Sequence, residues 1–121
     1  MWKKLVDIVY RRDDQVKYRT LSASELHSSI KMKNGSAVLL DVRNPDEFKE
    51  EHIPGAVNIA LHSPEFLKQI QKLEKNKTYF IYCRSGQRSA MACEILAQHG
   101  FEHIYDLRGG TTFYEGELKK D

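Results

Sequence analysis

Two short apolar runs constrain the fold of this chain most strongly. Helix-start signals follow the first of them. Residues 37–40, Ala-Val-Leu-Leu, and residues 79–82, Tyr-Phe-Ile-Tyr, show no alternation of apolar and polar side chains. Such unbroken runs are typical of strands covered on both faces, as in parallel sheets. After the first run, residues 44–47, Asn-Pro-Asp-Glu, carry the cap and first-turn residues of a helix. The pattern predicts an α/β fold with a mainly parallel sheet.

From residue 17 onward, strand-like and helix-like segments alternate along the chain. Ser22 and Glu25 have the spacing of a capping box at the start of one helix, and Asn34 with Gly35 ends that helix. We expect strands at residues 18–21, 37–41, 57–59, 78–82 and 104–107. We expect helices that begin near residues 22, 45, 64, 88 and 112.

Residues 1–16 differ from the rest of the chain. Trp2, Leu5, Val6 and Val9 recur at helical spacing among basic side chains, which predicts an N-terminal helical extension docked on the domain or on a partner. The alternatives are a frayed tail and a membrane-surface anchor. The anchor is disfavoured because the helix is short and acidic residues dilute its basic face. Residues 17–121 are expected to form one domain.

Composition narrows the classes of partner and compartment. The chain has 121 residues, with 19 Lys and Arg against 17 Asp and Glu, so no general basic surface indicates nucleic acid. Its apolar runs are far too short to span a membrane, and its start lacks the apolar core of a signal peptide. We therefore expect a cytoplasmic location. Two cysteines make no disulfide framework, and no spacing indicates a metal site or another cofactor.

The chemistry is concentrated in residues 83–88, Cys-Arg-Ser-Gly-Gln-Arg, between an expected strand and an expected helix. Backbone N–H groups of such a loop, and of the first helical turn, point towards one spot. The helix dipole and two guanidinium groups favour negative charge at that spot. A cysteine there is stabilised as its thiolate, so Cys83 is the candidate nucleophile and its substrate should be anionic.

Four stretches, in the right order and spacing, resemble the rhodanese (sulfurtransferase) family. They are residues 39–48, residues 52–59, residues 82–89, and residues 100–101 with 106–110. The similarity covers roughly residues 18–116 and is closest to the stand-alone, single-domain form. It implies a rhodanese-like three-layer sandwich, in which helices flank a mainly parallel central sheet of about five strands.

The resemblance also implies a persulfide mechanism centred on Cys83. This cysteine would take a sulfane sulfur from thiosulfate, a polysulfide or a persulfide. The Cys83–S–SH intermediate would then pass the sulfur to cyanide or to a thiol, and a protein acceptor stays open as a partner. The small residues Ser85 and Gly86 would let the backbone close around the sulfur.

The charged residues of the loop each have two interpretations. Arg84 would recruit the donor from solvent, or is a plain surface charge. Arg88 would bind an oxyanion with its guanidinium fork, or forms an ion pair that braces the loop. Glu47 aligns where two-domain members of the family carry a substrate-binding arginine. The expected substrate-binding residues are Arg84, Ser85, Gly86, Gln87 and Arg88.

Three residues outside the loop have expected structural roles. Asp41 and Arg43 match the family's Asp-x-Arg element, and we expect a partly buried ion pair that holds the strand end near the loop. Cys93 lies among small and apolar residues of the following helix. We interpret it as a small buried hydrophobe, with a resolving cysteine as the alternative.

Other functions are compatible with parts of this pattern. A phosphatase or arsenate reductase of similar fold needs five residues between cysteine and arginine, whereas four separate Cys83 from Arg88. The shorter loop fits a single sulfur rather than a tetrahedral oxyanion. A non-catalytic interaction module usually lacks the cysteine. A sulfur-relay carrier keeps it, and residues 1–16 would then dock the protein acceptor.

Overall fold

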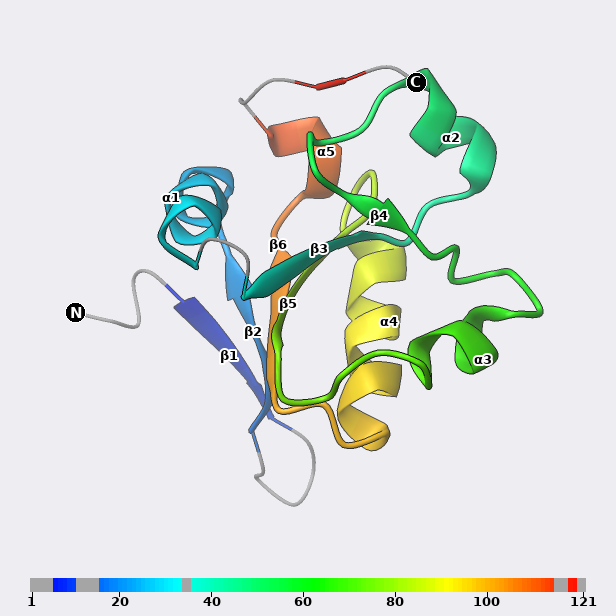
Figure 1. Ribbon diagram of the computed structural model, residues 1–121. Helices are drawn as coiled ribbons and strands as arrows, with labels where there is room; N and C mark the ends of the chain where they lie inside the picture. Colours follow the sequence, from blue (N-terminus) through cyan, green and yellow to red (C-terminus); the bar gives the residue numbers. More distant parts are fainter. Residues whose placement is uncertain (1–5, 11–15, 34–35, 115–117, 120–121) are drawn as a thin grey trace.

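The strands form a single six-stranded sheet (Figure 1). The computed structural model describes residues 6–10, 16–33, 36–114 and 118–119. The sheet order is β1-β2-β6-β5-β3-β4. All neighbouring pairs from β2 to β4 are parallel, and β1 alone is antiparallel to its neighbour. The strands are β1 (Val6–Tyr10), β2 (Val16–Leu21), β3 (Ala37–Asp41), β4 (Val57–Asn58), β5 (Thr78–Tyr82) and β6 (His103–Leu107).

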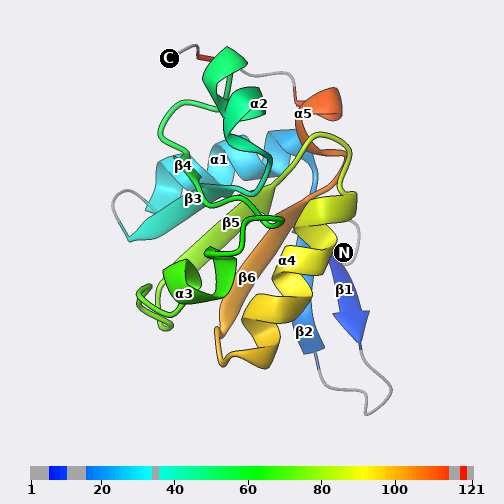
Figure 2. The same cartoon turned by 90° about the vertical axis from the view of Figure 1, so that its right-hand side faces the viewer.

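Helices cover both faces of the sheet, as Figure 2 shows for α3 and α4 on one of them. The helices are α1 (Ala23–Lys33), α2 (Pro45–Glu50), α3 (Phe66–Ile70), α4 (Gln87–Gln98) and α5 (Gly110–Phe113). Side chains of α3 and α4 pack on one face with Tyr79 and Ile81 of β5. Leu26 of α1 packs on the other face with Phe80 and Tyr82. The expected three-layer sandwich with a mainly parallel central sheet is therefore confirmed, and the five strands from β2 to β4 in the sheet order form its parallel part.

Local signals in the sequence account for the elements that position the site. The unbroken apolar runs form β3 and β5, which lie side by side with Ala37 paired to Thr78. The capping box before α1 is present, since the Ser22 N–H donates to Glu25 Oε1 at 2.8 Å and the Glu25 N–H donates to Ser22 Oγ at 3.3 Å. A second capping box joins Asn44 and Glu47 at the start of α2.

The helix expected over residues 1–16 is wrong for Val6–Tyr10, which form β1. This strand pairs with β2 in the register Val6 to Leu21 and Ile8 to Arg19, so it extends the same sheet. β-branched residues favour a strand, and the exposed edge of β2 offers backbone partners that a helix would leave unused. Residues 1–5 and 11–15 of the expected extension lie outside the described residues.

Two helices begin two residues away from their expected starts. Helix α3 begins at Phe66, two residues after the proline that was expected to open it, because residues 61–65 form turns. Helix α5 begins at Gly110 instead of near residue 112. This shift brings the Gly109-Gly110 turn against the Cys83 loop, at the carboxyl ends of the parallel strands. Ligands of open α/β sheets bind at this edge.

Candidate active site

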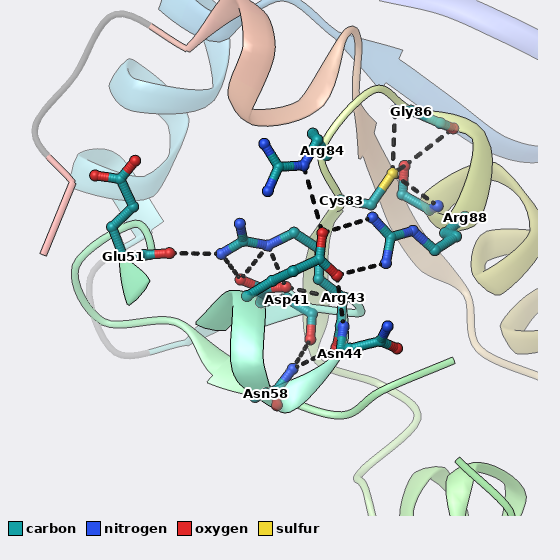
Figure 3. Close-up of polar contacts among 11 residues, drawn as sticks. Asp41, Arg43, Asn44, Glu51, Asn58, Cys83, Arg84, Gly86 and Arg88 are labelled. Carbon is teal, nitrogen blue, oxygen red and sulfur yellow. Dashed lines mark hydrogen bonds and ion pairs between the residues drawn. The ribbon is translucent and has the colours of Figure 1, made fainter. Parts of the chain in front are cut away.

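The Cys83 sulfur lies in a cradle of donors between β5 and α4 (Figure 3). The Gly86 N–H donates to Sγ at 3.0 Å, and the Ser89 N–H donates to it at 3.3 Å. The Ser89 Oγ lies 3.5 Å from the same sulfur. Cys83 is only 1% exposed. Two amide dipoles at the start of a helix therefore stabilise negative charge on this sulfur, which makes it suited to nucleophilic attack.

Glycines give the loop its shape. Gly86 precedes α4 with φ of 105°, a conformation that residues with a side chain rarely adopt. Gly110 packs so tightly on the loop that an added Cβ would overlap the carbonyl oxygen of Cys83. Beside it, the Thr111 N–H donates to the Cys83 carbonyl at 2.9 Å and the Thr112 N–H donates to the Arg84 carbonyl at 3.0 Å. The C-terminal turn thus holds the loop by its backbone.

The two arginines of the loop share one carboxylate, that of Glu47. Arg88 makes a two-point contact with it, Nη1 to Oε1 at 2.7 Å and Nη2 to Oε2 at 3.0 Å. Arg84 Nε lies 3.4 Å from Oε2. The hydrogen bond with Arg88 is the main reason that the pKa of Glu47 falls to about 2, and the same contact raises the pKa of Arg88. Glu47 therefore ties α2 to the loop.

The loop side chains differ in their access to solvent. Arg84 is 57% exposed, whereas Arg88 is 24% exposed. Ser85 and Gln87 are exposed as well. Of the five expected substrate-binding residues, Gly86 contacts the Cys83 sulfur through its N–H, and Arg84 is the more exposed of the two cations.

Asp41 and Arg43 form a buried ion pair at the end of β3. Arg43 Nε lies 3.0 Å from both carboxylate oxygens, and Nη2 lies 2.7 Å from Oδ2. Arg43 also donates to the Glu51 carbonyl at 2.7 Å, and the Asn58 side-chain amide donates to the Asp41 and Arg43 carbonyls. The pair joins β3, β4 and the segment after α2 into one support beneath the site (Figure 3).

Two polar residues at the site escaped the sequence analysis. Ser89 lies on the first turn of α4. Its backbone N–H donates to the Cys83 sulfur, and its Oγ lies beside the same sulfur. Asp106, on β6, is buried beneath α4. A signal for Ser89 was available, because it follows Arg88 within the first helical turn. Asp106 had none, since only the pairing of β6 with β5 places it opposite Ile81, two residues before the cysteine.

Cys93 lies on the same helix face as Ser89 but inside the core. It is fully buried, and burial is the main reason that the pKa of its thiol rises well above its ordinary value. Both cysteines are free thiols. Cys93 therefore packs as an uncharged apolar side chain. Within the described part of the chain, no three His, Cys, Asp or Glu side chains gather as a metal site requires.

Comparisons with known proteins identify the family of this chain. The family model of the rhodanese-like domain matches residues 22–117. The uncharacterized protein YqhL of Bacillus subtilis (strain 168) is 35% identical over 102 residues, which cover 84% of this chain and 75% of the relative. Thiosulfate sulfurtransferase PspE of Escherichia coli (strain K12) is 36% identical over 70 residues, which cover 58% of this chain and 67% of the relative.

A solved structure of a rhodanese-related protein is also similar to this chain. The crystal structure of a rhodanese-related protein from Thermoplasma volcanium matches with a TM-score of 0.75 and 32% identity, over 86% of this chain and 100% of the other. The chain belongs to the rhodanese-like domain family, and sulfurtransferases are among its relatives. Among the described residues, no helix is long and apolar enough to span a membrane.

Proposed function

We propose that the protein is a sulfurtransferase in which Cys83 carries the transferred sulfur as a persulfide. The observation that carries this proposal is the pair of backbone N–H groups, from Gly86 and Ser89, directed at the Cys83 sulfur. Such donors stabilise anionic sulfur, both as the thiolate and as the terminal sulfur of a persulfide. The sulfurtransferase relatives support the same class of reaction.

The proposed reaction has two displacements at sulfur. The Cys83 thiolate attacks the outer sulfur of thiosulfate, a new S–S bond forms, and sulfite leaves with the electron pair of the bond that breaks. Cyanide or an acceptor thiolate then attacks the outer sulfur of the Cys83 persulfide. The S–S bond to Cys83 breaks, and the thiolate is restored. A polysulfide or a thiol persulfide would enter the same first step with a thiolate as leaving group.

The loop cations support an anionic donor. Arg84 contacts Glu47 through Nε, so its exposed guanidinium end faces solvent and is our candidate for donor capture. Arg88, held by two hydrogen bonds to Glu47, keeps positive charge beside the sulfur. Free thiols at Cys83 and Cys93 support a reducing compartment, and we propose the cytoplasm. A thiol, free or on a protein, is our candidate acceptor.

Intact mass spectrometry tests the persulfide directly. After incubation with thiosulfate and removal of the excess, the wild-type mass should rise by about 32 Da, the mass of one sulfur atom. Cyanide should return the mass to its starting value and release thiocyanate. Peptide mapping should place the added sulfur on Cys83.

Two variants serve as controls. Cys93→Ala keeps the nucleophile and should keep the mass gain, whereas Cys83→Ser should abolish both the gain and thiocyanate formation. The proposal is wrong if Cys83→Ser retains activity. It is also wrong if the wild-type mass stays unchanged with thiosulfate, with a polysulfide and with a thiol persulfide alike.

A further inference from the structure

The carboxylate of Glu47 accepts hydrogen bonds from both arginines of the Cys83 loop (Figure 3 shows the two arginines). Arg88 Nη1 and Nη2 lie 2.7 and 3.0 Å from its two oxygens, so both ends of that guanidinium fork are occupied. Arg84 adds a longer contact, from Nε to Oε2 at 3.4 Å. A guanidinium fork binds an oxyanion through the same two-point geometry. The protein therefore fills the anion-binding end of Arg88 with a side chain of its own.

The start of α2 holds the Glu47 carboxylate in this position. Its Oε1 also accepts a hydrogen bond from the Asn44 N–H at 3.0 Å, as part of the capping box. Glu47 is only 19% exposed, and its pKa of about 2 keeps it ionised near neutral pH. A donor that displaced this carboxylate from Arg88 would leave a partly buried charge with fewer partners, which is costly. The carboxylate therefore stays in place when a donor approaches.

The charges beside the nucleophile add up to a single positive charge. Arg84 and Arg88 contribute two, and Glu47 removes one of them. Asp41 and Arg43, which also interact with these side chains, form a buried ion pair with no net charge. The loop therefore has one uncompensated cation for a donor and the nucleophile together.

Helix α2 strengthens this restriction. Its six residues carry three carboxylates, those of Asp46, Glu47 and Glu50, and one cation, Lys49. Asp46 and Glu50 are exposed. The helix that supplies Glu47 to the loop thus adds further negative charge, which opposes the approach of strongly anionic molecules.

The candidate donors differ in their charge. Thiosulfate carries two negative charges, and sulfite leaves with both of them. A free polysulfide is also doubly charged, whereas a thiol persulfide carries one negative charge on its sulfur atoms and releases a thiolate. Cys83 is buried and Arg84 is exposed, so a donor reaches the sulfur from the side on which the loop charges lie. A single uncompensated cation suits the singly charged donor best.

We propose that Glu47 is a specificity-determining residue, which selects singly charged thiol persulfides over doubly charged donors such as thiosulfate. The Cys83 thiolate attacks the outer sulfur of the persulfide anion, and a new S–S bond forms. The S–S bond of the donor breaks, and its thiolate leaves with the electron pair. The total charge is −2 on both sides of this step. Thiosulfate still reacts, but more slowly. The inference deepens the proposed function, on which it rests.

A pair of donors that differ by one charge tests the proposal. Methanethiosulfonate has the reactive outer sulfur of thiosulfate, but a methyl group replaces one oxygen, so the molecule carries a single negative charge. Cys83 displaces methanesulfinate from one donor and sulfite from the other. Quenched-flow mass spectrometry gives the second-order rate constant for persulfide formation with each donor. The intrinsic reactivity of the two donors cancels when their ratio is compared between wild type and a variant.

Glu47→Gln leaves both loop cations uncompensated. It should raise the rate constant for thiosulfate about tenfold more than that for methanethiosulfonate. The persulfide of 2-mercaptoethanol should respond to the substitution as methanethiosulfonate does. In about 1 M salt, where the Debye length is about 3 Å, most of the change in ratio should disappear. A merely loosened loop would slow all donors by one factor, so an unchanged ratio would overturn the proposal.

Two variants separate charge from shape and from place. Glu47→Asp keeps the charge on a shorter side chain and should keep the wild-type ratio, whereas a ratio like that of Glu47→Gln would contradict a role of charge. Asp46→Asn removes an exposed carboxylate from the same turn of α2. It should also keep the wild-type ratio. An equal change in Asp46→Asn would show that the net charge of α2, and not Glu47, selects the donor.

Wild-type protein alone gives a second test, should Glu47→Gln fail to fold. Because Glu47 compensates one loop cation, the rate with thiosulfate should fall no more steeply with added salt than the rate with methanethiosulfonate. A steeper fall with thiosulfate would overturn the proposal. Failure of the proposed function has a different signature, since no donor would then add sulfur to Cys83. Sulfur transfer without the expected donor preference would refute the role of Glu47 alone.

Discussion

Replacing Glu47 by glutamine tests how strongly this carboxylate ties α2 to the active loop. The pKa of Glu47 falls from 4.5 to about 2, chiefly through the hydrogen bond with Arg88. Each unit of pKa corresponds to about 1.4 kcal/mol, so the interaction of the ionised carboxylate stabilises the fold by roughly 3 kcal/mol. Glu47 is 19% exposed, which limits screening by solvent. Glutamine keeps part of the hydrogen bonding, so we expect Glu47→Gln to lower the free energy of unfolding by about 2–3 kcal/mol near neutral pH.

The sign of the pH dependence follows from the direction of this pKa change. Because folding lowers the pKa of Glu47, its contribution is complete above about 4.5 and disappears as the pH falls towards about 2. Urea denaturation of both proteins should therefore give a constant difference in stability between about pH 5 and 7. The difference should shrink to roughly half by about pH 3.

A neighbouring carboxylate on the same helix provides the control. Asp46 is exposed in the first turn of α2, and Asp46→Asn should cost no more than about 0.5 kcal/mol through the helix dipole. The reasoning is refuted if the effect of Glu47→Gln is independent of pH. It is equally refuted if the two substitutions destabilise the protein by the same amount.

Two further substitutions probe the backbone clamp, by which the Thr111 and Thr112 N–H groups hold the Cys83 loop, and the buried ion pair of Asp41 and Arg43. Gly110→Ala would place a methyl group into the Cys83 carbonyl oxygen. We therefore expect alkylation of Cys83 to be at least about tenfold slower and the free energy of unfolding to fall by about 1–3 kcal/mol. An unchanged alkylation rate would contradict the backbone clamp. Arg43→Met leaves the Asp41 carboxylate buried and unpaired, and should lower the free energy of unfolding in urea by about 3–5 kcal/mol. Adding Asp41→Asn to Arg43→Met should recover part of that loss, and a double variant no more stable than the single one would refute this account.

Elements with strong local signals were predictable from the sequence. The unbroken apolar runs gave β3 and β5 with their observed bounds, because strands covered on both faces need no polar alternation. Ser22 and Glu25 marked the start of α1 because a capping box acts within one turn of helix. The position of Cys83 between β5 and α4 follows from these same local rules.

Features that depend on distant segments were not predictable in this way. Val6 and Val9 belong to a helical spacing that begins at Trp2, yet residues 6–10 form a strand because they pair with the open edge of β2. Glu47 is far along the chain from Arg84 and Arg88, and only the folded sheet brings α2 beside the loop. The substrate-binding roles of Arg84, Ser85, Gly86, Gln87 and Arg88 stay predictions until a donor is bound.

The backbone clamp also orders events during synthesis of the chain. Cys83 leaves the ribosome before Thr111 and Thr112, whose amides hold the carbonyls of Cys83 and Arg84. Translation proceeds from the N-terminus, so a nascent chain carries this thiol without the contacts that fix its loop. The reactive geometry is therefore completed late, when the C-terminal segment docks. An incomplete chain exposes an ordinary cysteine in place of a poised one.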